Sequence, residues 1–375
     1  MDHVQLLSEL VAINSINPDL VPGAPGESEI ARYVAGWMKR ARMEVTLVET
    51  APGRPSVVGV VRGSGGGKSL MLNAHMDTVG VAGMENPHSP RVEGNRLYGR
   101  GAYDMKGSLC ACLLAADRAR DMKLRGDVIV TAVCDEEFAS IGTASVLERF
   151  KADAAIVTEP TALDICVAHK GFIWFEVESR GVAAHGSKPE IGVDAIANIG
   201  PVLAGLQALD RRLRSEPRHA LLGSGSIHAS LINGGQELST YPAHCSLSIE
   251  RRTVPGETLQ EAEDQMRAIL EATAEQNEAK LSLRATLSRE PFEVKQNEPI
   301  VGLLRSRVAA HRGAEPRIYG DTPWMDSALT SAAGIPTVVF GPGGGGAHAV
   351  VEWSNLDEVE AAIHILSAVA ADFCA

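Results

Sequence analysis

The sequence alternates between short apolar runs and helical patterns, and this alternation constrains the fold more than any other feature. In the N-terminal part, the apolar runs are rich in Val, Leu and Met and are bounded by Gly and Pro, as buried strands are. We predict strands at Glu44–Thr50, Ser56–Val61, Ser69–Ala74, Val128–Cys134 and Ala154–Thr158, and helices at 3–13, 27–42, 105–122 and 142–150. Strands and helices in this alternation are typical of a layered α/β domain.

The pattern changes after His169 and returns near Glu290. Between them we predict, in chain order, a strand (Phe172–Ser179), a helix (Val193–Leu213), two strands (Ser226–Ile232, Ala243–Arg251), a helix (Leu259–Ala279) and a strand (Lys280–Leu287). This order is typical of a two-layer α+β unit with an antiparallel sheet. The α/β style then resumes with a helix (Pro299–His311), a strand (Pro336–Phe340) and a closing helix (Asn355–Phe373).

We therefore predict an α/β domain with a mixed sheet, formed by residues 1–170 and 286–375, and an α+β domain of residues 171–285 inserted into it. Three consecutive domains are the alternative, but the last of them would be small.

Charge and cysteine content exclude several classes of protein. The 35 basic and 47 acidic side chains give a net charge of −12, which repels nucleic acid and anionic membranes, and aromatic residues, at 4%, are scarce for stacking on bases. The N-terminus lacks a signal-peptide pattern, and no run reaches the ~20 apolar residues of a membrane span. The six cysteines lie mostly in apolar runs without metal-binding spacing, so we expect reduced thiols in a cytoplasmic protein.

Two glycine-rich segments imitate nucleotide-binding motifs. GSGGGKS at 63–69 has Arg62 where a phosphate loop needs Gly, and a strand follows it, so we predict a hairpin turn there. GPGGGG at 341–346 matches a dinucleotide pattern, but no clear helix opens on it. The G-x-S-x-G and HExxH motifs are absent from the sequence. The acidic and histidine residues are therefore the candidates for a catalytic or metal-binding role.

Acidic and histidine residues follow the predicted strands, at the edge where α/β sheets place their sites. They occur in NAHMDTV (His75, Asp77), GRGAYDMKG (Asp104), CDEEFASIGT (Glu136, Glu137), IVTEPT (Glu159) and GGGGAHAVVEW (His348). Three of these motifs have plain structural alternatives: a buried hydrogen-bonded pair for His75 and Asp77, a helix cap for Asp104, and a loop residue for His348.

Glu136 and Glu137 have a poor structural explanation, because desolvated like charges repel one another without a cation. Their adjacent side chains diverge, so that one can face a metal while the other faces a water. Together, the motifs supply two imidazoles and three carboxylates as ligands and a spare carboxylate as a base. Nitrogen and oxygen ligands without thiolate suit zinc, with cobalt or manganese as substitutes, and two metals ~3.5–4 Å apart are a hydrolytic design.

In this order and spacing, the five motifs resemble those of the di-zinc exopeptidases and N-deacylases, the family that includes acetylornithine deacetylase, succinyl-diaminopimelate desuccinylase, carboxypeptidase G and aminoacylase. The resemblance implies that His75 and Glu159 hold one zinc, that Glu137 and His348 hold the other, and that Asp104 bridges them. It also implies that Asp77 orients His75 and that Glu136 is the general base. Glu159, where aminopeptidase relatives usually carry Asp, argues against an aminopeptidase.

The same resemblance makes the inserted domain a lid through which two copies dimerise. In RGVAAHGSKPEIGVDAI, His185 would reach into the partner's active site and stabilise the oxyanion. In SIERRTVPGE, Arg252 would bind the substrate carboxylate, with Arg251 on the other side of the strand. The chain departs from the family where Ser239 replaces a frequent Asn and where Ala328 replaces the Arg of desuccinylases, although Asp326 aligns well.

The function implied is that of a zinc-dependent hydrolase that cleaves the amide bond of an N-acyl amino acid with a zinc-bridged water and a Glu base. A carboxypeptidase or dipeptidase with the same site is the alternative within catalysis. An inactive metal-binding interaction module is the alternative of another class, and the presence of every ligand and of Glu136 argues against it. The sequence leaves open the amino acid, the acyl group, the native metal and a biosynthetic or catabolic role.

Overall fold

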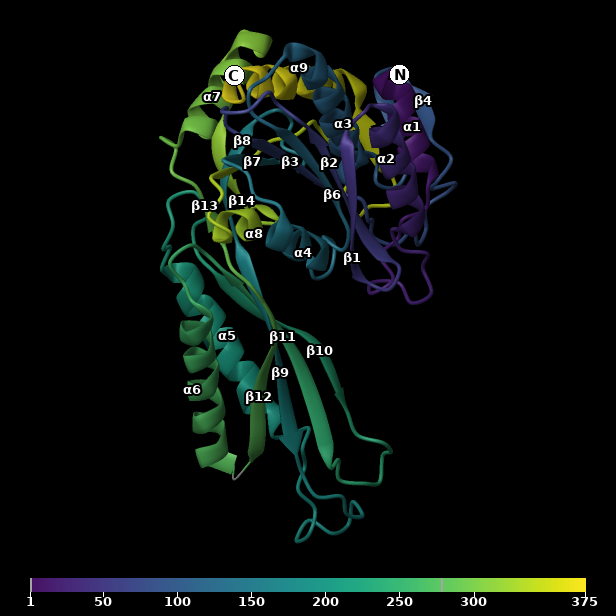
Figure 1. Cartoon of the computed structure of the whole chain (residues 1–375). Coiled ribbons are helices and arrows are strands. Elements are labelled where there is room, and N and C mark those ends of the chain that lie inside the picture. Colours follow the sequence, from purple (N-terminus) through teal and green to yellow (C-terminus); the bar gives the residue numbers. More distant parts are fainter. Residues whose placement is uncertain (1, 278) are drawn as a thin grey trace. The chain divides into compact units, whose positions relative to one another are not determined.

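The computed structural model describes residues 2–277 and 279–375, which fall into two compact units (Figure 1). The larger unit contains the chain up to Val167 together with Val294–Tyr319 and Met325–Ala375. The smaller unit contains Ala168–Glu293 and Gly320–Trp324. Among the described residues, no helix combines the length and the apolar character that crossing a membrane requires.

A mixed nine-stranded sheet, most of whose strands belong to the larger unit, has the order β1-β2-β6-β3-β7-β15-β8-β13, and β14 also pairs with β8. The strands are β1 (Glu44–Ala51), β2 (Arg54–Val61), β3 (Leu70–His75), β6 (Val128–Val133), β7 (Ala154–Val157), β8 (Ile165–His169), β13 (Phe292–Glu293), β14 (Ile318–Asp321) and β15 (Thr337–Val339). The central strands β6, β3 and β7 are mutually parallel, whereas β1, β2 and β6 pair antiparallel. Every residue of β3, β6 and β7 is buried, which explains why these strands are predominantly apolar. The predicted mixed α/β class is confirmed.

Helices pack on both faces of this sheet. They are α1 (His3–Ala12), α2 (Ser28–Arg40), α3 (Gly107–Ala119), α4 (Ile141–Arg149), α7 (Pro299–Arg312), α8 (Ser327–Ala332) and α9 (Leu356–Phe373), with short turns at Ala102–Lys106 and Arg120–Met122. Val58 and Val60 of β2 pack against Val146 of α4. Between them, Gly59 faces α2, where an added Cβ would lie 2.5 Å from the sulfur of Met38. Neighbouring residues of β2 therefore contact helices on opposite faces of the sheet.

The prediction of a hairpin turn at GSGGGKS is wrong. Strand β6 lies between β2 and β3, so this segment crosses to a strand that is not the neighbour of β2. Its backbone N–H groups at Ser64 and Gly65 donate to the carbonyls of Leu124 and Arg125. A Cβ at Gly67 would lie 2.4 Å from the backbone nitrogen of Gly126, so the glycines permit a close approach of two backbones.

A small second sheet completes the larger unit, with the order β16 (Gly344–Gly345), β17 (Trp353–Asn355), β5 (Arg96–Tyr98) and β4 (Arg91–Glu93). It pairs the glycine-rich segment at 341–346 with the residues before α9. No helix lies in the described residues 341–352, as the sequence pattern predicts.

The smaller unit is a four-stranded antiparallel sheet with two helices. Its strand order is β10 (Ser226–Gly234), β11 (His244–Thr253), β9 (Gly171–Arg180) and β12 (Lys280–Arg289), and its helices are α5 (Ile199–Ser215) and α6 (Leu259–Asn277). Alternate residues of β9, such as Phe175 and Val177, form the core with Leu206 of α5 and Met266 of α6. The order of strands and helices agrees with the sequence pattern.

The boundaries of two predicted helices in this unit differ from the structure. Helix α5 begins at Ile199 instead of Val193, because residues 195–198 form turns in which the Asp194 carboxylate accepts from the backbone N–H groups of Ile196 and Ala197 and the Asp194 carbonyl accepts from that of Asn198. Helix α6 ends at Asn277, and residue 278 of the predicted helix lies outside the described residues.

Candidate metal centre

Three parallel strands bring the predicted site residues to one edge of the large sheet. His75 is the last residue of β3, and its neighbours in the sheet, β6 and β7, end shortly before Glu136 and Glu159. Carboxyl ends of adjacent parallel strands meet, so these side chains converge although they are far apart in the sequence. The remaining members, Asp104 and His348, come from the turn before α3 and from the loop after β16.

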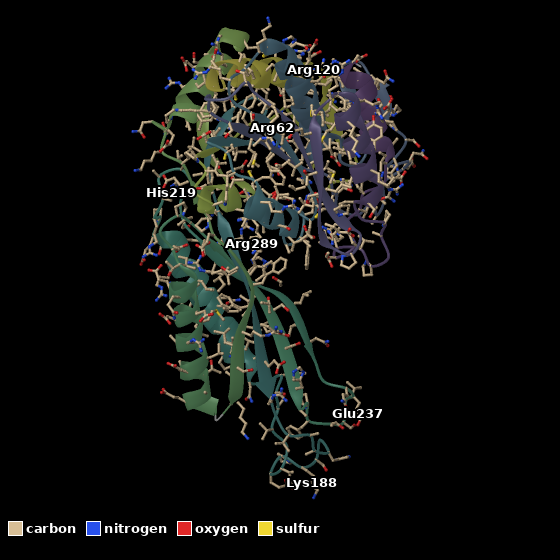
Figure 2. The ribbon with its side chains drawn as sticks, viewed as in Figure 1. Arg62, Arg120, Lys188, His219, Glu237 and Arg289 are labelled. Atoms are coloured by element: carbon tan, nitrogen blue, oxygen red, sulfur yellow. The ribbon has the colours of Figure 1, made fainter. Side chains whose placement is uncertain are left out.

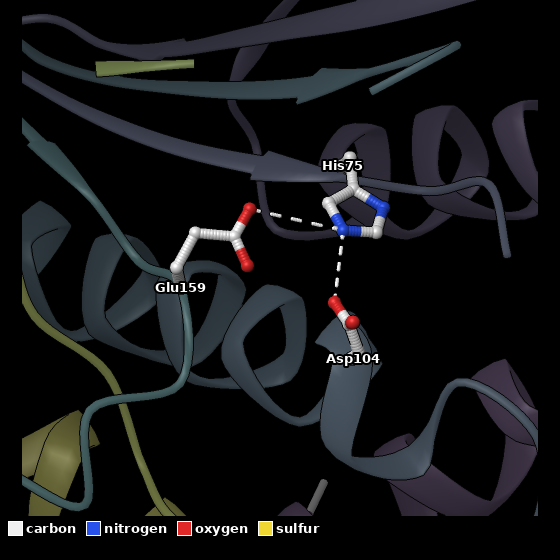
Figure 3. Close-up of side chains that lie close together, drawn as sticks. All are labelled: His75, Asp104 and Glu159. Atoms are coloured by element: carbon white, nitrogen blue, oxygen red, sulfur yellow. Dashed lines mark hydrogen bonds and ion pairs between the residues drawn. The ribbon is translucent and has the colours of Figure 1, made fainter. Parts of the chain in front are cut away.

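The first group of metal-ligand atoms comprises His75, Asp104 and Glu159, whose side chains point toward one another in Figure 3. His75 Nε2 lies 3.2 Å from Asp104 Oδ1 and 3.8 Å from Glu159 Oε1. All three atoms lie within 4.8 Å of one another.

The second group comprises Asp104, Glu137 and His348. His348 Nε2 lies 3.0 Å from Glu137 Oε2 and 3.4 Å from Asp104 Oδ2. Asp104 therefore belongs to both groups and turns a different oxygen toward each histidine. This is the arrangement that a carboxylate bridging two metals requires.

The electrostatics of the cluster favour a bound cation. Burial and the negative charge of Glu159 raise the pKa of Glu136 well above its usual value, and burial and Asp104 raise that of Glu137 to about 7. Hydrogen bonds to Asp104 and Glu137 raise the pKa of His348 to about 10. Glu137 Oε1 and Glu159 Oε1 are buried without a hydrogen-bond partner. Divalent metals would supply the missing positive charge, and these nitrogen and oxygen donors fit zinc.

Asp77 contacts both His75 and the turn that carries the two glutamates. His75 Nδ1 donates to the backbone carbonyl of Asp77 over 2.9 Å and lies 3.6 Å from its carboxylate. The carboxylate itself accepts from the backbone N–H groups of Glu136 and Glu137, at 3.1 and 3.2 Å. The Nδ1 contact leaves Nε2 of His75 facing the ligand groups.

Asp77 also belongs to a buried polar network that the sequence analysis did not predict. Asn17 Nδ2 donates to Asp77 Oδ2 and to Asp135 Oδ1, at 2.9 and 3.0 Å. Arg54 pairs with that Asp135 over 2.9 Å and with the buried Glu27 over 2.6 Å. Asp135 directly precedes Glu136, so the network fixes the start of the turn. The only sequence signal was a charged triplet at 135–137, of which we considered two members.

Asp326, which lies directly before α8, is a further carboxylate of the larger unit. It is buried, and its Oδ2 accepts from Thr143 Oγ1 over 2.5 Å. Burial raises its pKa to about 6. Ala328, the residue that departs from the desuccinylase pattern, lies two residues further on and is 5% exposed.

The other two predicted site residues, His185 and Arg252, belong to the smaller unit and form no part of the two ligand groups. His185 is exposed, and its ring nitrogen bonds Ser187 Oγ over 2.8 Å. Figure 2 shows Lys188, from the same loop, and Glu237 in the loops that follow β9 and β10.

Arg252 of β11 donates from Nη2 to the carbonyl of Thr322 over 2.6 Å, and its Nη1 lies 3.5 Å from Glu250. Its guanidinium also lies 5.6 Å from the centre of the Phe172 ring. Arg251 points to the opposite face of the strand, where it is 2% exposed and pairs with Glu257 over 2.8 Å. Of these two arginines, Arg252 is therefore the one that lies on the face that the helices leave uncovered.

The chain resembles known proteins both in its sequence and in its fold. The family model of Peptidase family M20/M25/M40 matches residues 71–372. The chain is 29% identical to an acetylornithine deacetylase of Vibrio atlanticus (strain LGP32), over 99% of this chain and 98% of that protein. It is 28% identical to an N-formyl-4-amino-5-aminomethyl-2-methylpyrimidine deformylase of Halalkalibacterium halodurans, over 87% of this chain and 84% of that protein.

Among solved structures, an M20 family metallo-carboxypeptidase from Sulfolobus solfataricus matches with a TM-score of 0.81 at 18% identity, over 99% of both chains. A dinuclear metal binding peptidase of the M20 family from Bacillus subtilis matches with a TM-score of 0.75 at 17% identity, over 99% of this chain and 97% of that one. At these identities the structural likeness concerns the fold.

Proposed function

This chain belongs to peptidase family M20/M25/M40 and is a metal-dependent hydrolase, and we propose that it cleaves the amide bond of an N-acyl amino acid. The choice of substrate is carried by the similarity over nearly the whole chain to a protein named as a deacetylase. The similarity to a deformylase, whose name implies removal of a formyl group, supports hydrolysis of an amide with a small acyl group. A carboxypeptidase or dipeptidase that uses the same residues is the alternative.

We assign the metal ligands from the two groups of ligand atoms described above. His75 and Glu159 would hold one zinc ion, Glu137 and His348 the other, and Asp104 would contact both, with cobalt or manganese as substitutes. When bound, the ions supply a Lewis acid for the scissile carbonyl and lower the pKa of a nearby water.

Glu136 is assigned as the general base. It belongs to neither ligand group of the described residues, yet its Oε2 lies 4.0 Å from His75 Nε2. A carboxylate beside the ligands can take a proton from water and pass it to the departing amine. Asp77 would hold Glu136 in place through the backbone bond to its N–H. An inactive module would need no such intact set of groups.

A substrate panel tests this function directly. We expect turnover of N-acetyl amino acids that carry a free carboxylate, measured by release of the primary amine. N-succinyl and N-benzoyl amino acids and dipeptides complete the panel. Hydrolysis of dipeptides without hydrolysis of any N-acyl amino acid would favour the peptidase instead.

Replacement of Arg252 by alanine should lower kcat/KM for N-acyl amino acids. The loss of transition-state stabilisation should be about 2–5 kcal/mol, as expected for a lost charged hydrogen bond. A guanidinium on a rigid strand can bind the α-carboxylate in a bidentate manner. Arg180→Ala is the matched control, because Arg180 lies on the neighbouring strand and its side chain is 70% exposed. Wild-type protein that cleaves N-acyl amino acid amides as readily as the free acids would refute this role.

Ala328 bears on the acyl group. Because it stands where desuccinylases often carry Arg, a second substrate carboxylate lacks that partner, and we expect N-acetyl substrates to be preferred over N-succinyl ones. The ratio of the two kcat/KM values measures this preference, and a ratio in favour of succinyl would contradict it.

We further propose a homodimer formed through the smaller unit. Strand β10 is an edge of its sheet, and near it Leu231, Ile232 and Leu238 are 71%, 55% and 107% exposed. A row of unpaired backbone groups with exposed apolar side chains is suited to pairing with a second copy about a two-fold axis. In that dimer, His185 would act in the partner's site.

Mixing two inactive variants tests the action of His185. Heterodimers of Glu136→Gln and His185→Ala contain one site with both groups intact, so equal mixing with subunit exchange should restore about a quarter of the wild-type activity. A mixture of Glu136→Gln and His348→Ala is the control, since both changes affect a subunit's own site and no activity should return. If subunits exchange and the first mixture stays inactive, His185 does not act across the dimer.

A further inference from the structure

A buried ion pair connects the two chain segments that carry Asp104 and His348. Arg100 Nη1 lies 2.6 Å from Glu352 Oε2, and the two side chains are 3% and 0% exposed. Neither residue belongs to the ligand groups, and the sequence pattern did not point to either of them. Arg100 lies four residues before Asp104, and Glu352 lies four residues after His348.

Glu352 binds the turn before α3. Its Oε1 accepts from the backbone N–H groups of Tyr103 and Asp104, both at 3.0 Å, and its Oε2 accepts from that of Gly101, also at 3.0 Å. The turn is irregular, with φ of 77° at Gly101 and non-helical torsions at Asp104. A turn with few helical bonds of its own depends on outside acceptors for its shape. Glu352 is such an acceptor for the residue that both ligand groups share.

Arg100 binds the loop that carries His348. Its Nη2 donates to the carbonyl of Ala349 over 3.0 Å, and its Nε donates to the carbonyl of Gly80 over 3.1 Å. The imidazole of His348 is 56% exposed, and its backbone has φ of 59°, in the left-handed region. An exposed metal ligand on such a loop needs hydrogen bonds close by to keep its position. Here the buried guanidinium of Arg100 binds the carbonyl of Ala349, the residue after His348.

We propose that Arg100 and Glu352 are positioning residues that fix His348 relative to Asp104 and thereby set the affinity of the second metal position. The inference rests on the proposed metal centre. The first position should depend less on this pair, because His75 is 1% exposed and ends a central strand, whereas His348 lies on an exposed loop. Removal of partners that orient metal ligands typically lowers metal affinity by about 10–100-fold.

Titration of metal-free protein with Co²⁺ tests the proposal without using activity. Wild-type protein should bind two ions per chain, as measured by calorimetry and by the cobalt absorption spectrum. In Glu352→Gln, an amide NH2 group, which can only donate, replaces one of the two carboxylate oxygens that accept from Arg100 and from the turn. We expect the weaker of the two dissociation constants to rise about 10–100-fold, with the tighter one changed less than about threefold.

Two further variants make the test decisive. Glu257→Gln is the matched control, because it breaks a similarly buried pair with Arg251 in the smaller unit, and it should leave both constants unchanged. Arg100→Lys keeps the charge but loses the planar fork that reaches three acceptors, and it should weaken the second site selectively if Glu352→Gln does not fold. Equal weakening of both sites, or wild-type constants in a folded variant, would overturn the proposal. Wild-type protein that binds fewer than two ions would instead overturn the proposed metal centre.

Discussion

Glu136→Gln should lower kcat by about 10²–10⁴-fold while both metals stay bound. The amide is close in size to the carboxylate, so the backbone bond from Glu136 N–H to Asp77 and that from Ser140 Oγ to the Glu136 carbonyl should persist. What the variant loses is a group that can accept a proton. Because Glu136 lies in neither ligand group, its neutralisation should not release metal.

Steady-state kinetics combined with elemental analysis separate this role from a structural one. Glu137→Gln is the matched control: it changes the adjacent residue, whose Oε2 lies 3.0 Å from His348 Nε2, and it should reduce metal content. The melting temperatures of both variants report on the fold. A metal-loaded Glu136→Gln protein with near-normal kcat would show that another group moves the proton.

The sequence predicted those site residues that follow a recognisable local pattern, namely the end of a buried strand. A largely apolar strand is recognisable in the sequence together with its end, and His75, Glu136 and Glu159 lie at or just after the ends of three such strands. The geometry of parallel strands then brings these residues together. The long helices and the strands of the smaller unit were recognisable for the same reason, because the periodicity of each is complete within its own segment.

What the sequence did not reveal depends on contacts between distant segments. The hairpin at residues 63–69 was predicted because β2 and β3 follow one another, and only the insertion of β6 between them overturns it. Asn17 and Arg54 are separated by 118 and 81 residues from the Asp135 that they bind, and neither lies in a recognisable motif. Short strands such as β16 and β17 have two or three residues, too few for a periodic pattern.

Removal of the metals should abolish activity, and readdition of Zn²⁺ should restore it. Without cations, buried carboxylates lie side by side in the cluster. Their burial and mutual repulsion raise the pKa values of Glu136, Glu137 and Glu159. His75→Ala and His348→Ala should each lower metal occupancy, since each removes a nitrogen ligand that water replaces poorly. His228→Ala is a control, because His228 is 58% exposed and lies on β10 of the smaller unit.

The same electrostatics predict the dependence of metal binding on pH. The pKa of His348 is raised to about 10 and that of Glu137 to about 7, so at neutral pH the metal-free protein holds protons that ligands must lose. Metal binding should therefore release protons, and the apparent affinity should rise as the pH rises through this range. Calorimetry in buffers of different ionisation enthalpy measures the number of protons released. Stoichiometric binding without proton release would show that the metals are held by other groups, and the absence of any bound metal after reconstitution would refute the assigned centre.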